Sequence, residues 1–281
     1  MFAAGLLGGR VALVTGGGTG LGKASALELA RCGAGVTIAG RRAEVLEAAV
    51  AEIGELAGAA AGAAAGAVDW IAGDVRERGE ARRLVETVLE RRGRLDVLVN
   101  NAGGQFFSPA ELIVAKGWRA VWRLNVEGML NMSEAAFELA LEPAGGGTVV
   151  NVTLSPHHGM PGMAHSGSAR ATVEALTREY ARRWEPAGVA VTAVAAGHFD
   201  TEVLAKYPAS VRAGASRTVP LQRLGTVAEH AWLVALLASP LGRAFNGSTI
   251  TLDGARDNWC GPWPPPGLAD ESGEVPTEER R

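Results

Sequence analysis

The sequence predicts an α/β fold of three layers, in which a parallel β-sheet carries helices on both faces. Short apolar runs recur along the chain and alternate with stretches whose apolar residues fall at helical spacing. Each run is apolar throughout, as are strands of a parallel sheet that are buried on both faces. A cluster of glycines within 16–22 follows the first run directly. The 281 residues, of which 47% are hydrophobic, are enough to bury one such core, which predicts a single domain.

The predicted elements alternate along the chain. Strands are predicted over 11–14, 36–39, 68–72, 95–99, 148–152, 189–194 and 248–252. Helices are predicted from the glycine cluster to 31 and over 45–56, 81–88, 116–141, 168–184 and 226–238. Gly33 and Gly35 end the first helix, and Pro143 ends the long amphipathic segment 116–141. The alternating Ala and Gly residues of 57–67 fit either a frayed helix or a loop.

This alternation predicts a doubly wound, Rossmann-type sheet whose functional site lies at the carboxyl ends of the strands. We expect residues 1–256 to form this domain. Residues 257–281 contain three consecutive prolines, which predicts a C-terminal tail rather than a further helix.

Charge and composition favour small molecules, or copies of the same chain, as partners. The formal net charge of −3 provides no basic surface for nucleic acid or an anionic membrane. Cys32 and Cys260 have no spacing typical of a disulfide framework or a metal site. No apolar run has the length of a membrane helix and the N-terminus does not resemble a signal peptide, so we expect a cytoplasmic protein. The many large apolar residues of 116–141 and 168–184 predict a homodimer or homotetramer.

The glycine cluster has the composition of a dinucleotide-binding turn. A predicted strand leads into it and a predicted helix follows it, whereas a glycine-rich surface loop requires neither. Glycine permits the tight turn, and the missing Cβ lets the backbone approach a pyrophosphate at the positive end of the helix. The residues expected to bind the cofactor here are Gly16, Thr19, Gly20, Leu21 and Gly22.

The residues after the second strand predict which nucleotide is bound, because this strand ends beside the adenosine ribose. An acidic side chain there binds the 2′-hydroxyl and repels a 2′-phosphate, but this chain has Gly40-Arg41-Arg42. A guanidinium group suits a phosphate dianion. We therefore expect NADP(H) rather than NAD(H), with Arg41 facing the 2′-phosphate.

From residue 7 to about residue 254 the chain resembles the short-chain dehydrogenase/reductase family. The similarity starts with the Thr-Gly-x-x-x-Gly-x-Gly spacing of the glycine cluster and continues with Asn-Asn-Ala-Gly after the fourth strand. It implies further cofactor contacts at the ends of the third, fourth and sixth strands, and a water relay at Asn125 on the long helix. The implied cofactor contacts are Asp74, Val75, Asn101, Ala102, Gly103, Gly197 and Thr201.

The catalytic positions depart from the Ser, Tyr and Lys that the resemblance implies. Ser166 stands at the tyrosine's place, Arg170 at the lysine's, and the serine's place falls on Thr153 or on the next residue, Leu154. Arg170 still offers donors to ribose hydroxyls, but its pKa is too high for it to transfer protons. Among the nearby histidines at 157, 158 and 165, His165 is the best candidate for an acid. Their spacing is not that of metal ligands, so we expect no metal.

This set of residues favours reduction of an activated C=C bond. A ketone requires a proton on oxygen as the hydride arrives, whereas an α,β-unsaturated thioester requires hydrogen bonds to oxygen and a later proton on Cα. The runs Asn-Asn-Ala-Gly-Gly-Gln-Phe and His-Ser-Gly-Ser-Ala-Arg are similar to peroxisomal-type trans-2-enoyl-CoA reductases and, more loosely, to 2,4-dienoyl-CoA reductases. An acyl thioester is then the expected substrate. Two alternatives stay open: a ketone or alcohol oxidoreductase of specialised metabolism, and a dinucleotide-binding protein with little catalysis.

Overall fold

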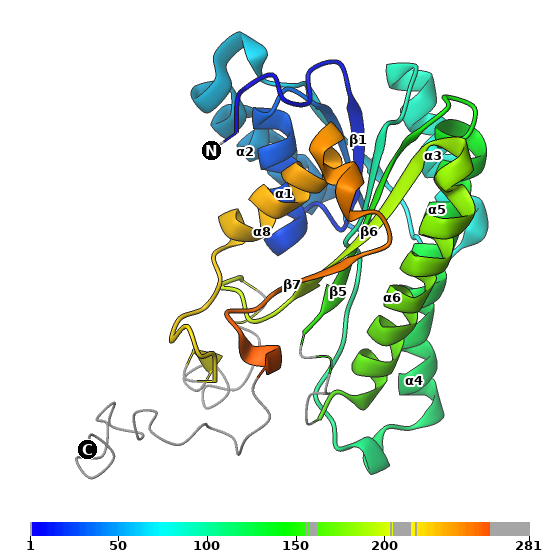
Figure 1. The fold of residues 1–281 in the computed structure, drawn as a ribbon, viewed down its shortest axis with the longest axis vertical. Helices are drawn as coiled ribbons and strands as arrows, with labels where there is room; N and C mark the ends of the chain where they lie inside the picture. Colours follow the sequence, from blue (N-terminus) through cyan, green and yellow to red (C-terminus); the bar gives the residue numbers. More distant parts are fainter. Residues whose placement is uncertain are drawn as a thin grey trace.

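The computed structural model describes residues 2–155, 157, 162–202, 204, 215–216 and 218–258. Its centre is one parallel sheet of seven strands in the order β3-β2-β1-β4-β5-β6-β7 (Figure 1). The strands are β1 Val11–Thr15, β2 Gly35–Gly40, β3 Val68–Ala72, β4 Val97–Asn100, β5 Gly147–Leu154, β6 Val189–Ala196 and β7 Thr249–Leu252. The strand order reverses between β1 and β4, and a doubly wound sheet opens a crevice at such a point.

Helices cover both faces of this sheet, as the sequence predicts (Figure 1). One layer contains α1 Gly20–Arg31, α2 Ala43–Ala61 and α8 Val227–Ala238. The other contains α3 Arg78–Arg92, α4 Ala115–Trp122, α5 Gly128–Ala136 and α6 Ala164–Trp184. Short 3-10 helices span Gly62–Ala64, Ala110–Leu112, Glu185–Ala187, Pro240–Phe245 and Arg256–Asn258 (η8).

The sheet divides the apolar core into two clusters. Successive side chains of a strand point to opposite faces, so Ala12 and Val14 pack with α1, α2 and α8, while Val11 and Leu13 pack with α3, α5 and α6. These strand residues are 7% exposed or less. The burial of both faces explains why the strands of the sequence are apolar throughout, and it confirms the predicted three layers.

The predicted helix 116–141 is helical but not uniform. Two π-helical turns, Arg123–Glu127 (η3) and Phe137–Leu141 (η4), interrupt it. At η3 the side-chain amide of Asn125 donates to the Val121 carbonyl, at 2.7 Å, and to the Gly104 carbonyl, at 2.9 Å. The side chain thus occupies a carbonyl that the α-helical ladder normally uses, and π turns of this kind are frequent at functional sites.

Two further boundaries differ from the sequence prediction. Helix α6 begins at Ala164, four residues before the predicted start, so that His165 and Ser166 lie in its first turn. The backbone amides of Ser166 and Gly167 both donate to the Met163 carbonyl, which nucleates this early turn. The stretch 57–67 is helical up to residue 64, as the end of α2 and a 3-10 helix.

Several predictions concern parts of the chain that are only partly described. Of the predicted tail, Asp257 and Asn258 lie in η8, and 259–281 are outside the described residues. Tyr207 and Cys260 are also outside them. Cys32 is free and buried. Within the part that is described, no helix is long and apolar enough to cross a membrane, and no cluster of His, Cys, Asp and Glu could hold a metal ion.

Candidate active site

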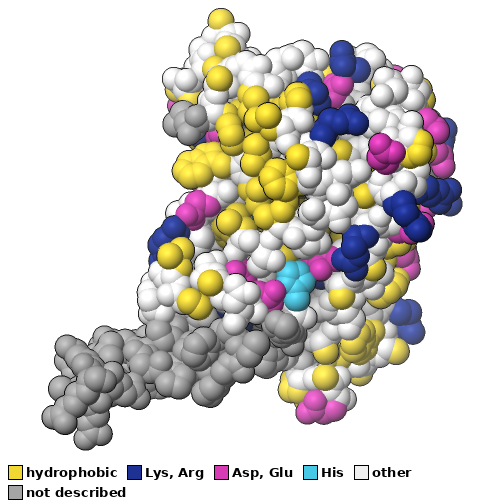
Figure 2. Space-filling model, viewed as in Figure 1, with side chains coloured by type: hydrophobic (Ala, Val, Ile, Leu, Met, Phe, Trp, Pro, Cys, Tyr) yellow, Lys and Arg dark blue, Asp and Glu magenta, His cyan; other side chains and the backbone are white. Residues whose placement is uncertain are grey.

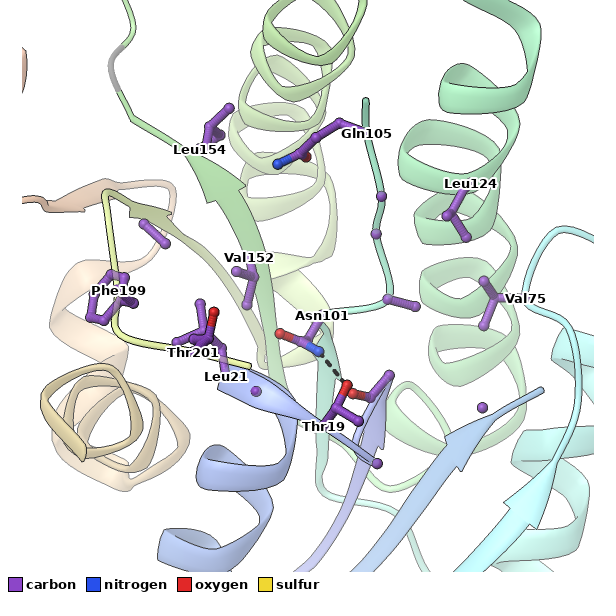
Figure 3. A pocket seen from close by; sticks show the side chains of 18 of the residues that line it. Thr19, Leu21, Val75, Asn101, Gln105, Leu124, Val152, Leu154, Phe199 and Thr201 are labelled. Atoms are coloured by element: carbon purple, nitrogen blue, oxygen red, sulfur yellow. Dashed lines mark hydrogen bonds between the residues drawn. The ribbon is translucent and has the colours of Figure 1, made fainter. Parts of the chain in front are cut away.

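A cavity of about 600 Å³ lies at the carboxyl ends of the strands, where the sequence predicts the functional site (Figure 3). Thr19 and Asn101 lie toward one end of it, and Gln105 and Leu154 lie toward the other. Most of the predicted site residues form its wall: Gly16, Thr19, Gly20, Leu21, Arg41, Asp74, Val75, Asn101, Ala102, Gly103, Thr153, Arg170, Gly197 and Thr201. The remaining four, Gly22, Asn125, His165 and Ser166, lie behind the wall.

The glycine turn after β1 needs glycine for two different reasons. Gly16 and Gly20 have φ angles of +65° and +53°, which are strained for other residues. Gly22 is helical, but a Cβ there would lie 2.4 Å from Asn101 Nδ2 and 2.4 Å from the Gly16 carbonyl oxygen. Gly22 therefore permits the close packing that shapes the turn, and it does not line the cavity.

The run Asn100-Asn101-Ala102-Gly103 is tied to this turn by hydrogen bonds. Asn101 Nδ2 donates to the carbonyl of Thr15, at 3.0 Å, and to that of Gly16, at 3.3 Å. In return, Thr15 Oγ1 accepts from the backbone amides of Asn101 and Ala102, each at 3.0 Å. The ends of β1 and β4 are thereby held together at the crevice.

The start of α1 has the properties of an anion-binding site. Its first backbone N–H groups have no partner within the helix. The N-cap residue Thr19 makes no side-chain capping bond, and the first turn contains no acidic residue. Since Thr19, Gly20 and Leu21 line the cavity, these residues fit the pyrophosphate of a dinucleotide.

Two arginines follow β2, and a carboxylate that is paired with an arginine follows the neighbouring strand β3. Arg41 and Arg42 line the cavity, together with Asp74. Asp74 accepts hydrogen bonds from Arg76 Nε at 2.9 Å and 3.0 Å, and these bonds hold the pKa of Asp74 below its ordinary value against the opposing effect of burial. Arg41 is exposed and forms no ion pair with the described residues. An anionic group fits beside Arg41, because Arg76 already neutralises the adjacent carboxylate.

Arg170 is the cation at the centre of the cavity. Its Nη1 donates to the Val152 carbonyl at 2.7 Å, and a Cβ on Gly103 would lie 2.4 Å from its Nη2. Its Nε is buried without a hydrogen-bond partner, and no described carboxylate forms an ion pair with it. Burial lowers the pKa of Arg170 to about 10, which leaves the guanidinium charged at neutral pH. A charged group with unused donors fits a polar ligand such as ribose hydroxyls.

Asn125 holds the backbone beside Arg170 in place. Besides donating to Gly104, it accepts from the Gly104 amide through Oδ1, at 3.2 Å, and its residue is 2% exposed. Asn125 thus shapes the backbone that passes Arg170. Its proposed water relay stays a prediction.

Ser166, which the sequence comparison with the family predicts at the tyrosine's place, contacts Gln105. Ser166 is fully buried, and its hydroxyl donates to Gln105 Oε1 at 3.3 Å. The Gln105 side chain lines the cavity (Figure 3). Since Oε1 accepts from Ser166, the amide NH2 is left to face the cavity. The sequence alone indicates no role for Gln105, because its contact with Ser166 joins two segments that are distant in sequence.

His165 does not lie in the cavity wall. It is 1% exposed and packs edge-on against Phe106, with ring centroids 4.3 Å apart, and against Trp118, at 6.0 Å. Burial lowers the pKa of His165, so the ring is neutral at pH 7. The structure therefore gives the predicted acid the position of a core aromatic residue. Tyr180 is likewise remote: it stacks on Trp184 at 4.0 Å, and burial raises its pKa to about 12.

Two other histidines lie closer to the site. His198 lines the cavity, and burial together with the charge of Arg256 lowers its pKa to about 4, so that it is neutral. His157 contacts Glu174 on α6, and Glu174 in turn accepts from the hydroxyl of Thr153 in the cavity wall, at 2.9 Å. His158 lies outside the described residues. Glu174 was missed because only the packing of α6 against β5 brings it to Thr153.

A dinucleotide-shaped crevice at the strand ends, an anion-accepting helix start and a central cation define a dinucleotide-binding oxidoreductase of the Rossmann class. Residues 16–255 match the family described as enoyl-(acyl carrier protein) reductase. The chain belongs to the short-chain dehydrogenase/reductase family, whose members use a nicotinamide dinucleotide.

Individual relatives agree with this assignment. The chain is 34% identical over 260 residues to the probable 2,4-dienoyl-CoA reductase of Bacillus subtilis, covering 91% of this chain and 98% of that protein. It is 34% identical over 253 residues to the peroxisomal 2,4-dienoyl-CoA reductase of Danio rerio, covering 89% and 82%. Among solved structures, the citronellol catabolism dehydrogenase of Pseudomonas aeruginosa matches with a TM-score of 0.80 and 39% identity, covering 92% and 98%.

Proposed function

We propose that this protein reduces an activated C=C bond conjugated to a thioester, with NADP(H) as the cofactor. The observation that carries the proposal is the composition of the cavity: Gln105 and Arg170 line it, and the buried hydroxyl of Ser166 donates to Gln105. The family resemblance assigns the tyrosine's place to Ser166 and the lysine's place to Arg170. Neither Ser166 nor Arg170 is an acid suited to protonate a carbonyl oxygen at neutral pH. The 2,4-dienoyl-CoA reductases among the relatives support the same reading.

The chain's own groups suit hydride addition to Cβ. Bound NADPH supplies the hydride. Negative charge then develops on the thioester oxygen, where hydrogen-bond donors lower the barrier. The Gln105 amide and the Arg170 guanidinium are two donors in the described wall of the cavity. Cα takes its proton in a separate step, so no phenol is required.

The test is steady-state oxidation of NADPH with a short trans-2-enoyl-CoA, a 2,4-dienoyl-CoA and a matched β-ketoacyl-CoA. We expect kcat/KM to be higher with either unsaturated thioester than with the ketone. Ser166→Ala is expected to keep much of this activity, because Ser166 only positions Gln105. Ser168→Ala, on the exposed side of the same helix, is the control. A preference for the ketone would contradict the proposal.

A second candidate is oxidation or reduction at an alcohol or ketone. The similarity to a citronellol catabolism dehydrogenase favours it, because that name describes a dehydrogenase of alcohol breakdown. Turnover with alcohols or ketones and none with unsaturated thioesters would select this candidate. Tight NADPH binding without turnover on either class would select the third reading, a binding protein with little catalysis.

NADPH is expected to bind about 10- to 100-fold more tightly than NADH, because a charge-assisted pair between Arg41 and a 2′-phosphate contributes roughly 1.5 to 3 kcal/mol. The supporting observation is that Arg41 lines the cavity without an ion-pair partner among the described residues. Fluorescence titration of both nucleotides measures the difference. Arg41→Ala is expected to remove most of it, whereas Arg178→Ala, on exposed α6 surface, is not. Equal affinities in the wild type would refute NADP(H) selectivity.

We also propose that the protein is a homodimer or homotetramer. Most large apolar residues of 116–141 and 168–184 are buried within the chain, so these segments alone no longer require a partner. A more exposed apolar face lies over α8 and the 3-10 helix after it, with Trp232 42%, Leu241 63% and Phe245 38% exposed (Figure 2). Light scattering that detects only the 29.0 kDa chain at micromolar concentration would contradict self-association. The cytoplasmic location stays a prediction.

A further inference from the structure

We propose that Thr153, Glu174 and His157 form a proton relay that carries protons from solvent to the cavity, where they reach Cα of the substrate. The proposal rests on the function proposed above, since it supplies the proton that C=C reduction still needs after hydride transfer. Thr153 is part of the cavity wall, and His157 has a side chain that is 30% exposed. Glu174 lies between them.

The contacts along this chain of groups are continuous. Thr153 Oγ1 donates to Glu174 Oε1 at 2.9 Å, and His157 Nε2 is 3.0 Å from the same oxygen. The Glu174 side chain is only 10% exposed, so this carboxylate has little direct access to water. A buried carboxylate shared by a hydroxyl and an imidazole can accept a proton from one and pass it to the other.

The placement of Glu174 ties the relay to the reaction centre. Glu174 follows Arg170 by four residues on α6, so the two side chains lie on the same face of that helix. Arg170 donates to the carbonyl of Val152, the residue before Thr153. The cation that faces the ligand and the proposed proton path therefore converge on the end of β5. Arg170 itself does not release a proton at neutral pH.

His157 has the surroundings of a proton reservoir. Its Nδ1 lies 2.5 Å from Asp257 Oδ2, and its backbone amide donates to Asp257 Oδ1 at 2.5 Å. The charged groups around it are Glu174 from α6 and Asp257 from η8, with Asp253 and Arg256 next to Asp257. Burial opposes the charged ring, but the two carboxylates outweigh burial and raise the pKa of His157 above 6.5. The imidazolium thus persists near neutral pH.

The proton balance closes without a further reactant. Hydride addition at Cβ breaks the C=C π bond and leaves its electron pair on Cα and the thioester oxygen. With Glu174 protonated, the Thr153 hydroxyl accepts from the carboxyl group and turns its own proton toward the cavity. Cα takes that proton, and Thr153 regains one from the Glu174 carboxyl group. Glu174 receives that proton from His157 Nε2, and water reprotonates the exposed imidazole.

Glu174→Gln and Thr153→Val are the direct tests. We expect each to lower kcat with the enoyl-CoA by about 10²-fold, because positioned general acids contribute about 10²- to 10⁴-fold, with little change in KM. Thr153→Ser is expected to restore most of kcat, since it retains the hydroxyl. Glu179→Gln, an exposed glutamate on the same helix, is the matched control. Unchanged NADPH affinity in each variant shows that the site is folded.

The pH profile distinguishes a relay from a structural contact. The donor form is the imidazolium, so wild-type kcat is expected to be highest at low pH and to fall as pH rises through the raised pKa of His157. His157→Gln keeps a donor toward Glu174 but does not titrate. In this variant, the fall of kcat with rising pH should therefore disappear. The solvent deuterium isotope effect on kcat should grow in Glu174→Gln, because proton delivery becomes slower.

The experiments distinguish a failure of the relay from a failure of the proposed function. If the wild type reduces the enoyl-CoA and the Glu174→Gln and His157→Gln variants keep its kcat within twofold and its pH profile, the relay is wrong and the proposed function stands. If the wild type reduces only the ketone, the proposed function is wrong. In that case the same variants are assayed on the ketone, whose oxygen also takes a proton. Their kcat then tests the relay independently of the proposed function.

Discussion

Arg170→Ala is expected to lower kcat/KM for NADPH oxidation by about 10²-fold or more, the magnitude seen when one preorganised donor is removed from an active site. Arg170 is the central cation of the cavity, with Nη1 on the Val152 carbonyl and Nε without a partner among the described residues. Its removal leaves both a ligand-facing void and an unpaired backbone carbonyl. We expect NADPH affinity to fall together with kcat, because the proposed role of the same group is to bind the cofactor's ribose.

The measurement combines steady-state kinetics with a fluorescence titration of NADPH. Arg178→Ala removes an exposed arginine from the same helix and is the control for the loss of charge. Arg170→Lys is informative as well: it keeps the charge but loses the fork of donors, so we expect it to recover only part of the activity. An Arg170→Ala variant with wild-type kcat/KM would show that this residue is merely a structural part of the wall.

Gly22→Ala is expected to have the largest effect on stability, a loss of about 2–4 kcal/mol in the free energy of unfolding from overpacking and displaced hydrogen bonds. The added Cβ would lie 2.4 Å from Asn101 Nδ2 and from the Gly16 carbonyl oxygen. Asn101 would have to leave the carbonyls of Thr15 and Gly16, which opens the junction of β1 and β4. NADPH affinity should fall as well, although Gly22 does not line the cavity.

Urea unfolding of the wild type and of Gly22→Ala, followed by circular dichroism, measures the loss in the free energy of unfolding. Gly54→Ala is a sharp control, because nothing lies within 4 Å of a Cβ at that position of α2. That substitution should stabilise the protein by up to about 1 kcal/mol, since alanine favours helix over glycine. If Gly22→Ala unfolded at the same urea concentration as the wild type, the tight junction would not matter to stability.

Local patterns in the chain are sufficient to predict the layers, the strands and the end of the sheet that holds the site. Apolar strands such as Val36–Ala39 indicate burial on both faces of the sheet, and glycines at 16 and 20 indicate positive φ angles. These signals are short in range, because a strand, a turn and a helix start are specified by neighbouring residues. The structure accordingly places Arg41, Arg170 and the glycine turn around one cavity.

The surroundings of the polar side chains around Gln105 and Thr153 required the tertiary structure. His165 and Ser166 stand in the sequence next to the missing tyrosine, yet the early start of α6 turns both behind the wall. Gln105 follows β4 and reaches Ser166 only in the folded chain, and the packing of α6 against β5 brings Glu174 to Thr153.

The sequence by itself thus determined the fold and the cofactor class, because these depend on residue type and local spacing. Only the tertiary structure decided the surroundings of each histidine. A neutral His165 fills an aromatic core site, whereas His157 lies between Glu174 and Asp257. The physical reason is that the protonation of an imidazole depends on burial and on nearby charge, and both depend on segments distant in sequence.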